Sequence, residues 1–396
     1  MKQGWEIKKL GEVLLIERGG SPRPIQKYMT SSPDGINWIK ISDATASDKY
    51  IYETKEKITR AGLHKTRVVN DGDFILSNSM SFGRPYIMKT TGCIHDGWLV
   101  LKQNEKKTFD TDFLYYLLSS PYVFQQFNSL ASGSTVRNLN ISLVSSVKVP
   151  VPSIKEQERL VSMLEDIFTE ISKAKDNAEQ NLKNAKELFE SYLQNVFTNK
   201  NGGWKEEPLG NVCDTGAGGT PLKSHKDYYD NGDIPWLRSG EVDKRDITQC
   251  ELYITPKGLK NSSAKLFPVD TVLIAMYGAT AGQVGILRFE CSTNQAVCGI
   301  LPNKNFIPEF LYYKFLAGKD VLVKQAVGGA QPNISQIKIR NTFVPVIPVK
   351  EQEVVIKKLN ELSIETKRLE AIYEQKLKDL EELKKSILQK AFNGEL

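Results

Sequence analysis

The sequence predicts an α+β protein with a pseudo-twofold internal repeat, in which two lobes of mixed α and β structure are separated by an antiparallel coiled coil of two long helices. Residues 149–158 and 344–353 are near-copies that share prolines followed by Lys-Glu-Gln-Glu. A long helical pattern follows each copy, and a lobe of about 150 residues, a usual domain size, precedes each. This order indicates a duplication of lobe plus helix. The predicted segments are 1–150, 151–200, 201–346 and 347–396.

The two lobes align with each other along nearly their whole length. Segments that share residues and order are 19–22 with 218–221, 36–39 with 234–237, 58–63 with 254–259, and 113–116 with 310–313. Short apolar or alternating runs interrupted by Gly, Asn and Asp predict strands at 38–41, 73–77, 98–102, 272–276 and 284–287. Helical patterns cover 112–127 and 308–324. Each lobe is therefore expected to combine an irregular sheet with helices.

The two long helices each carry an apolar stripe. In the first helix the stripe steps by fours and threes, as in a heptad seam, through Leu164, Phe168, Ile171, Ala178, Leu182, Ala185, Phe189, Tyr192 and Val196. The second stripe is wider and comprises Val355, Leu359, Leu362, Leu369, Tyr373, Leu377, Leu380, Leu383 and Ile387. A helix of about 40 residues is roughly 60 Å long. Because its stripe needs a partner, we expect the two copies to pair. We expect the pair to be antiparallel, since a parallel pair would need the second lobe to span the length of the helices, and residues 199–203 are the expected linker between the halves.

The composition is that of a soluble globular protein with a basic bias in its lobes. The net charge is +6, and residues 1–153 hold 20 basic but 14 acidic side chains. Such a surface favours a polyanionic partner. Five cysteines form no C-x-x-C pair, no apolar run could cross a bilayer, and the start lacks a signal-peptide core. We therefore expect a cytoplasmic protein with no membrane partner.

Motifs for catalysis are missing from the sequence. It contains neither a phosphate-binding G-x-x-x-x-G-K-[ST] loop nor H-E-x-x-H nor the [DNS]-P-P-[YFW] tetrapeptide of amino-methyltransferases. Asp34, Glu53 and Lys55 loosely fit a metal-dependent nuclease core, without a counterpart in the second lobe. This nuclease is one alternative interpretation, and a coiled-coil scaffold that binds no DNA is another.

Repeated polar loops are the candidate binding sites. Glycine-rich segments 18–24 and 216–221 lie beside basic residues and could bind phosphates through backbone N–H groups, although tight turns are the alternative. A second polar pair is 132–138 and 328–333, and the loops at 78–84 and 276–283 differ between the lobes. Side chains here could bind phosphates or base edges. The candidate DNA-binding residues are Arg18, Arg23, Lys27, Asn78, Ser79, Arg84, Arg137, Asn138, Lys223, His225, Lys226, Arg238, Tyr277, Gln283 and Asn333.

The helix starts offer a further hypothesis. Glu156, Gln157, Glu351 and Gln352 lie in the first turns of the two predicted helices. They are candidate contacts for partner proteins, and solvated capping residues are the alternative.

The repeated motifs resemble those of type I restriction-modification specificity (S) subunits. The resemblance lies in the Pro…Glu-Gln-helix pattern at 149–157 and 344–352, in Gly-Trp…Leu-Gly at the start of each lobe, and in Gly-Gly-Thr-Pro and Ile-Pro-Trp-Leu-Arg of the second lobe. The first lobe departs from it at Ser21 and Asn37, in place of Thr and Pro.

This resemblance implies a non-catalytic DNA-recognition subunit. Each lobe would be a target recognition domain for one half of a bipartite, asymmetric site in double-stranded DNA, and the helices would set the gap and dock two modification (methyltransferase) subunits. S-adenosylmethionine, ATP and Mg would be bound by the modification and restriction (translocase/nuclease) subunits, and no cofactor by this chain.

Overall fold

The protein divides into two compact units, each with one lobe and parts of both long helices. The computed structural model describes residues 4–78, 82–103, 107–131, 138–198, 203–324 and 333–396. Unit 1 is Met1–Glu179 with Gln375–Leu396, and unit 2 is Gln180–Glu374. The long helices are α6 (Ile154–Thr198) and α12 (Val349–Asn393), each of 45 residues. Residues 199–202 of the predicted linker lie outside the described residues.

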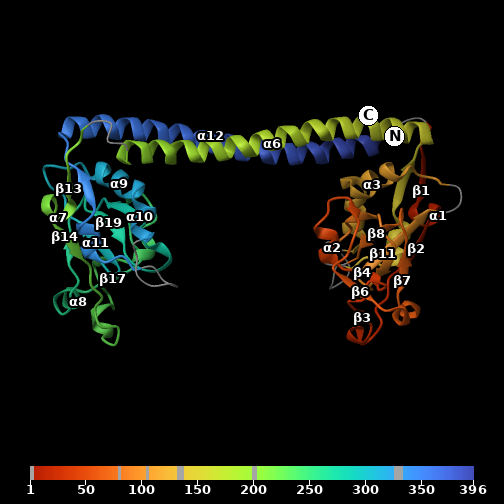
Figure 1. The fold of residues 1–396 in the computed structure, drawn as a ribbon, viewed down its shortest axis with the longest axis horizontal. Helices are drawn as coiled ribbons and strands as arrows, with labels where there is room; N and C mark the ends of the chain where they lie inside the picture. The colour runs from red at the N-terminus through yellow and green to blue at the C-terminus, as the bar shows by residue number, and fades with distance from the viewer. Residues whose placement is uncertain (1–3, 79–81, 104–106, 132–137, 199–202, 325–332) are drawn as a thin grey trace. The chain divides into compact units, whose positions relative to one another are not determined.

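The first lobe, in unit 1, is built on two sheets within the described residues (Figure 1). Their strand orders are β2-β11-β8-β9-β5 and β3-β6-β4-β10-β7. Neighbouring strands are antiparallel except for β5 with β9 and β4 with β10, which are parallel. The strands are β2 (Leu14–Arg18), β3 (Met29–Thr30), β4 (Ile36–Ile39), β5 (Tyr50–Ile51), β6 (Glu56–Ile58), β7 (Arg67–Val69), β8 (Phe74–Ser77), β9 (Pro85–Met88), β10 (Gly92–Ile94) and β11 (Trp98–Gln103).

Short helices and one strand pair complete the first lobe. The helices are α1 (Leu10–Val13), η1 (Ile25–Lys27), α2 (Ile41–Thr45), η2 (Arg60–Lys65), α3 (Thr111–Ser119), α4 (Pro121–Ala131) and α5 (Ile141–Ser146). The single helix expected at 112–127 is two helices, because Pro121 has no N–H to continue the ladder of α3. Strand β1 (Glu6–Lys9) pairs antiparallel with β12 (Lys148–Val151), where the chain enters and leaves the lobe.

The second lobe, in unit 2, repeats this arrangement. Its sheets have the orders β14-β22-β19-β20-β16 and β17-β15-β21-β18, and β13 pairs with β23 as β1 does with β12. Its strands are β13 (Glu206–Pro208), β14 (Thr215–Ala217), β15 (Ile234–Leu237), β16 (Asp246–Ile247), β17 (Tyr253–Ile254), β18 (Leu266–Phe267), β19 (Val272–Ala275), β20 (Val284–Leu287), β21 (Cys291–Thr293), β22 (Val297–Ile300) and β23 (Phe343–Pro345). Its helices are α7 (Leu209–Val212), η3 (Lys226–Tyr228), η4 (Ser239–Glu241), α8 (Pro256–Lys260), η5 (Gly278–Thr280), α9 (Pro308–Ala317), α10 (Lys319–Lys324) and α11 (Gln336–Arg340).

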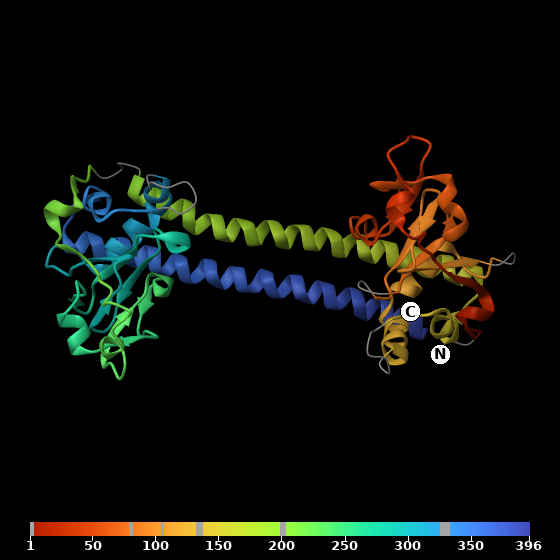
Figure 2. The same ribbon diagram turned by 90° about the horizontal axis from the view of Figure 1, so that it is seen from below.

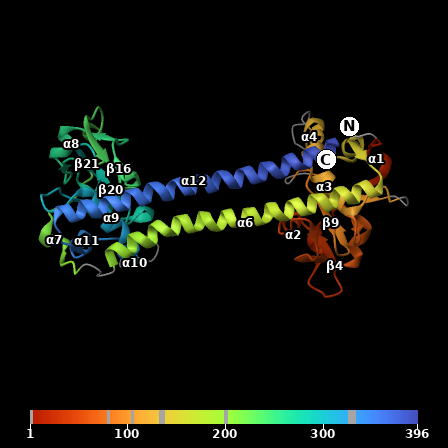
Figure 3. The ribbon, with the colours of Figure 1, turned by 90° about the horizontal axis from the view of Figure 1, so that it is seen from above.

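In each unit one core joins the lobe to both long helices. In unit 1, α3 lies between the sheet and the long helices (Figure 1). Phe113 of α3 packs edge-on against Phe392 of α12, with 5.4 Å between the ring centroids. The last turns of α12 lie beside α3 and α4 (Figures 2 and 3). In unit 2, α9 occupies the equivalent place, and Leu193 of α6 and Leu359 of α12 share its core.

The two long helices pack together antiparallel. In unit 1 Lys175 of α6 forms an ion pair of 2.8 Å with Glu381 of α12, and Phe168 lies 5.2 Å under the ammonium group of Lys384. Residue numbers therefore rise along one helix as they fall along the other. The predicted α+β repeat with an antiparallel helix pair is confirmed.

One position of the predicted stripe on α12 is wrong. Leu383 is 47% exposed, whereas the ammonium group of the neighbouring Lys384 lies over the Phe168 ring. Near the end of α12 the buried residues are Leu388, Ala391 and Phe392, so the helix turns this face toward the core of the lobe instead of continuing the heptad seam. Thr366 of α12 is buried, and its hydroxyl donates to the Leu362 carbonyl at 3.0 Å.

Among the described residues, no helix combines the length and the apolar character needed to cross a bilayer.

Truncating Phe392 should loosen the end of α12 from the first lobe. Phe392 is 1% exposed, so Phe392→Ala is expected to lower the free energy of unfolding of unit 1 by about 3–5 kcal/mol, measured by chemical denaturation. Leu383→Ala on the same helix is the control and should change it by less than about 0.5 kcal/mol. Equal effects of the two changes would contradict the packing described here.

Candidate nucleic-acid interface

In unit 1 a turn at residues 95–97, between β10 and β11, gathers polar segments from distant parts of the sequence. Gly19 N donates to the Trp98 carbonyl at 3.0 Å and Gly20 N to the Ile94 carbonyl at 3.1 Å. A Cβ on Gly19 would lie 2.1 Å from the His95 carbonyl oxygen, so only glycine allows the loop to approach this closely. We call residues 95–97 the Asp96 turn.

Side chains of the predicted interface converge on Asp96. Its carbonyl oxygen accepts from Arg18 Nε at 3.1 Å and from Asn78 Nδ2 at 2.8 Å. Its carboxylate accepts from Ser21 Oγ at 2.7 Å and lies 3.6 Å from the Arg23 guanidinium. The hydrogen bond from Ser21 is the main cause that lowers the pKa of Asp96, so the carboxylate is charged at neutral pH. The structure thus brings Arg18, Arg23 and Asn78 together.

The second polar loop of the first lobe joins the same cluster. The Asn78 carbonyl accepts from Leu139 N at 3.0 Å, which places Asn138 next to it in the chain. Asn138 Oδ1 is buried and has no hydrogen-bond partner among the described residues. Two predicted residues, Ser79 and Arg137, lie outside the described residues.

Unit 2 contains the same backbone frame around residues 294–296, which we call the Gln295 turn. Gly218 N donates to the Val297 carbonyl at 3.0 Å, and Gly219 N donates to the Thr293 carbonyl at 2.9 Å. Thr220 Oγ1 donates to Gln295 Oε1, as Ser21 does to Asp96 in unit 1. The frame is therefore duplicated, although the side chains at its centre differ.

Two predicted residues of unit 2 adjoin the Gln295 turn. Met276 N donates to the Ala296 carbonyl at 2.7 Å, and the Met276 carbonyl accepts from Ile334 N at 2.8 Å. Their neighbours Tyr277 and Asn333 form an isolated antiparallel bridge. Both are exposed, so their side chains lie at the surface beside the turn.

Within the part of the chain that the structure describes, the other predicted residues make no hydrogen bond or ion pair with either turn. In unit 1 Lys27 is exposed at the end of η1, and Arg84 lies 3.5 Å from Asp48 and over the Tyr86 ring. In unit 2 Lys223 and Lys226 are exposed, and His225 stacks on Tyr228 at 4.7 Å. Arg238 forms an ion pair of 2.6 Å with Glu251, and Gln283 is half-buried. Their assignment to a DNA surface stays a prediction.

Sequence reasoning missed the centres of both turns. His95, Asp96, Asn294 and Gln295 were not among the candidates, although a polar pair just before an apolar strand recurs at the same place in both halves. His95 Nδ1 accepts from Gly97 N at 2.9 Å, and Asn294 Oδ1 accepts from Ala296 N at 3.2 Å. His95 and Asn294 therefore hold the two turns by equivalent bonds.

The hypothesis that Gln157 and Gln352 contact partner proteins is wrong. Both side chains are 0% exposed and hydrogen-bonded inside their own units. Glu351 is exposed and Glu156 half-buried at the same helix starts.

The residues of the alternative nuclease core do not form a metal site. Glu53 and Lys55 line a cavity of about 540 Å³ in the first lobe, and Asp34 is not among its lining residues. The described residues contain no group of three or more His, Cys, Asp or Glu side chains that could hold a metal ion.

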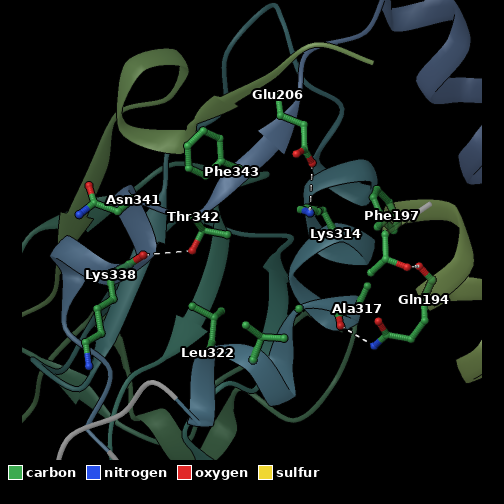
Figure 4. A pocket seen from close by; sticks show the side chains of 13 residues that line it. Gln194, Phe197, Glu206, Lys314, Ala317, Leu322, Lys338, Asn341, Thr342 and Phe343 are labelled. Carbon is green, nitrogen blue, oxygen red and sulfur yellow. Dashed lines mark hydrogen bonds and ion pairs between the residues drawn. The ribbon is translucent and has the colours of Figure 1, made fainter. Parts of the chain in front are cut away.

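A cavity of about 450 Å³ in unit 2 lies where α6 ends against α9, α10, α11 and β23 (Figure 4). Lys314 and Glu206 point toward each other across it, 3.9 Å apart. Burial lowers the pKa of Lys314, and Glu206 opposes that shift. Gln194 of α6 donates to the Ala317 carbonyl at 2.5 Å, so polar contacts join the helix to the lobe here. Sequence reasoning gave no signal for this cavity.

The stability of unit 1 should depend on pH through His95. Burial lowers the pKa of His95, helped by Lys40 and opposed by Asp96. As pH falls below about 6.5 the unfolded chain takes up this proton first, so stability present at neutral pH is lost. His95→Asn is expected to flatten this loss in denaturation curves between about pH 7 and pH 5, because asparagine makes the equivalent bond in unit 2. The reciprocal change, Asn294→His, should give unit 2 the same dependence, and unchanged curves for both variants would contradict the assignment.

Comparisons with known proteins give the family. The model of the type I restriction modification DNA specificity domain matches residues 2–180 and 201–381, once for each half of the repeat. The chain is 26% identical over 274 residues to the specificity subunit of the type I restriction enzyme EcoR124I/EcoR124II of Escherichia coli. That match covers 66% of this chain and 65% of the relative, so the chain matches just under two thirds of that relative's length.

A second relative and a solved structure extend over the whole chain. The chain is 24% identical to the putative type I restriction enzyme MjaX specificity subunit of Methanocaldococcus jannaschii, with 100% of this chain and 94% of the relative covered. A chain solved in a study of complex assembly and conformational transition of the type I R-M system shares the fold, with a TM-score of 0.78, 21% identity, and coverage of 100% and 99%. The match confirms the resemblance to type I restriction-modification specificity subunits that the sequence motifs predicted. The duplicated lobes and the paired helices thus belong to a member of the type I restriction-modification specificity subunit family.

Proposed function

We propose that each lobe of this specificity subunit recognises one half of a bipartite, asymmetric site in double-stranded DNA. The observation that carries this proposal is the pair of equivalent turns, one on each lobe, with a shared backbone frame and different side chains at the centre. A shared frame keeps the same approach to DNA, whereas different side chains select different bases. The chain would thus recognise two different half-sites.

The chemistry of the two turns fits contacts to DNA. Arg18 and Arg23 supply positive charge beside the Asp96 turn, which suits phosphate contacts. The Asp96 side chain is 47% exposed and accepts hydrogen bonds, as needed for the amino group of cytosine. Gln295 is exposed and both donates and accepts, as needed for adenine. These differences support two half-sites of different sequence.

We propose that α6 and α12 set the gap between the half-sites and dock the methyltransferase subunits. Two-part sites are commonly spaced by about one turn of DNA, roughly 34–36 Å. Each helix has 45 residues, or roughly 68 Å at 1.5 Å per residue, which is long enough for a spacer of that scale. Paired helices are stiff, so they would hold one spacing.

We propose that the chemistry is performed by partner proteins in the cytoplasm. Two modification subunits would bring S-adenosylmethionine, and restriction subunits would bring ATP and Mg. The relatives named above are specificity subunits of type I restriction enzymes, which supports this division of labour.

Lys226 is expected to contact a DNA phosphate, so loss of its charge should weaken binding to all sequences equally. Lys226 is exposed on η3, and Lys226→Ala is expected to reduce the slope of log K against log salt concentration by about 1, without changing the preferred sequence. Fluorescence anisotropy of labelled duplexes at several salt concentrations measures this slope. Lys183→Ala on α6, outside the lobes, is the matched loss of charge and should leave the slope unchanged.

Exchange of one lobe tests the proposed function itself. Residues 201–348 are replaced by the second lobe of another family member, and methylated motifs are determined by methylation-sensitive sequencing of host DNA. We expect one half of the motif to change and the other to persist. A change in both halves would contradict independent recognition by the lobes, and a host motif that does not depend on this chain would support the scaffold interpretation.

A further inference from the structure

Each long helix begins with a fully buried glutamine that binds only main-chain atoms. In unit 1 Gln157 Oε1 accepts from Asp110 N at 2.8 Å, and its Nε2 donates to the carbonyls of Thr108 at 3.1 Å and Pro152 at 2.9 Å. Asp110 is the N-cap of α3, so this amide joins α6 to the start of the helix that underlies the sheet. We call this set of bonds the amide clamp.

Unit 2 repeats the amide clamp with different surrounding residues. Gln352 Oε1 accepts from Ile307 N at 2.9 Å, and its Nε2 donates to the carbonyls of Asn305 at 2.7 Å and Ile347 at 2.9 Å. Ile307 is the N-cap of α9, the counterpart of α3. The same three bonds therefore join each long helix to the same part of its own lobe.

In unit 2 a second contact lies further along the helix. Asn360 of α12 accepts from Arg245 NH1 at 2.8 Å and from the Tyr313 hydroxyl at 2.6 Å, and Arg245 lies over the Tyr313 ring at 5.8 Å. The pairs Tyr115-Tyr116 and Tyr312-Tyr313 are equivalent in the two lobes. We call a lobe cation over the second tyrosine of such a pair, together with the long-helix residue that this tyrosine contacts, the cation latch. Asn360 is two helical turns beyond Gln352, so the lobe is attached at two separate points.

Unit 1 has a cation latch at the equivalent place. Lys49 lies 5.2 Å from the Tyr116 ring, and this ring packs edge-on against Phe168 of α6. Burial disfavours the charged ammonium group, but hydrogen bonding to Asp112 at 2.5 Å raises the pKa of Lys49 to about 12. Lys49 is therefore cationic at neutral pH, as the latch requires.

We infer that the amide clamp and the cation latch act together as positioning residues that fix the rotation of each lobe about its spacer helix, so that the complex accepts a single gap length. The shared core packs each lobe on the long helices without directional bonds, whereas the clamp and the latch, about two helical turns apart in unit 2, add directional bonds that restrain its rotation. This inference rests on the proposed function, and it assigns the selection of gap length to Gln157, Gln352 and Asn360 in addition to the length of the helices.

The geometry of DNA explains why rotation must be restrained. Adding one base pair to the gap moves a half-site by about 3.4 Å and turns it by roughly 35° about the axis. A lobe that swings through tens of degrees could reach both positions and would not distinguish the two gaps. Discrimination between adjacent gap lengths therefore measures how firmly a lobe is held.

Gln352→Met tests the amide clamp, because methionine keeps the volume but leaves Ile307 N, Asn305 O and Ile347 O without this partner. The chain is assembled with its modification subunits, and methylation rates are measured on duplexes with the same half-sites and gaps of the preferred length or one base pair more or less. We expect the ratio of preferred to altered gap to fall by about tenfold or more, with the half-sites unchanged. Glu353→Ala, an exposed neighbour, is the control and should keep the wild-type ratio.

The outcomes separate a positioning role from a merely structural one. General destabilisation removes active complex equally for every gap and leaves the ratio unchanged, so a lower melting temperature with the wild-type ratio would overturn the inference. Altered half-sites would also overturn it. Failure of the wild-type complex to select any split site would instead refute the proposed function.

Asn360→Leu provides a second variant if Gln352→Met does not fold. It removes the bonds of α12 to Arg245 and Tyr313 from a half-buried position while it keeps the amide clamp. We expect the same loss of gap discrimination, again with unchanged half-sites. If this folded variant keeps the wild-type ratio, the latch does not restrain the lobe and the inference is wrong.

Discussion

The buried amide at the start of α6 and of α12 is the contact on which the rest of each unit depends. Gln157 and Gln352 are 0% exposed, and each donates twice and accepts once. A glutamate could not donate these bonds and a leucine could make none, so either would leave buried main-chain groups unpaired, at about 1–3 kcal/mol each. The amide ties the helix to α3 or α9, and the sheet packs on that helix. The turns at the candidate interface directly precede β11 and β22, which belong to these sheets. The placement of the turns therefore follows from this junction.

The sequence predicted the repeat and the long helices because their signals are regular. An apolar stripe over many turns predicts a helix whatever surrounds it, and matched segments in one order indicate duplication. The prediction from sequence failed where a tertiary contact decides whether a side chain is buried or exposed. Leu383 has the spacing of a seam residue, but the last turns of α12 face the lobe, and Lys384 takes its place over Phe168. Gln157 and Gln352 look like surface residues in the sequence, because two of the three backbone groups that bind each side chain lie more than 40 residues away.

Only some residues of the candidate interface have a local signal in the sequence, because tertiary contacts bring the others into place. A glycine-rich loop beside arginines pointed to Arg18 and Arg23, and a loop that differs between the lobes pointed to Asn78; the structure brings the three together, and their contact with DNA stays a prediction. The centre of the cluster was missed, because Asp96 is an ordinary acidic residue until β10 and β11 place it against a loop 75 residues earlier. The same holds for Gln295 and Thr220. The signal that the sequence does contain for both turns is the recurrence of their polar pairs before the equivalent strands β11 and β22.

The amide clamps also explain how lobes can diverge while the junction persists. All partners of Gln157 and Gln352 are backbone N–H and carbonyl groups, and every residue type except proline offers both. A lobe can therefore change its surface, and even the side chains next to the junction, without losing these bonds. The two lobes already show this, because the clamped segments contain Thr108 and Asp110 in one and Asn305 and Ile307 in the other. A joint that recognises only backbone lets one pair of helices carry lobes of different sequence, which is the property that a subunit with two different half-sites requires.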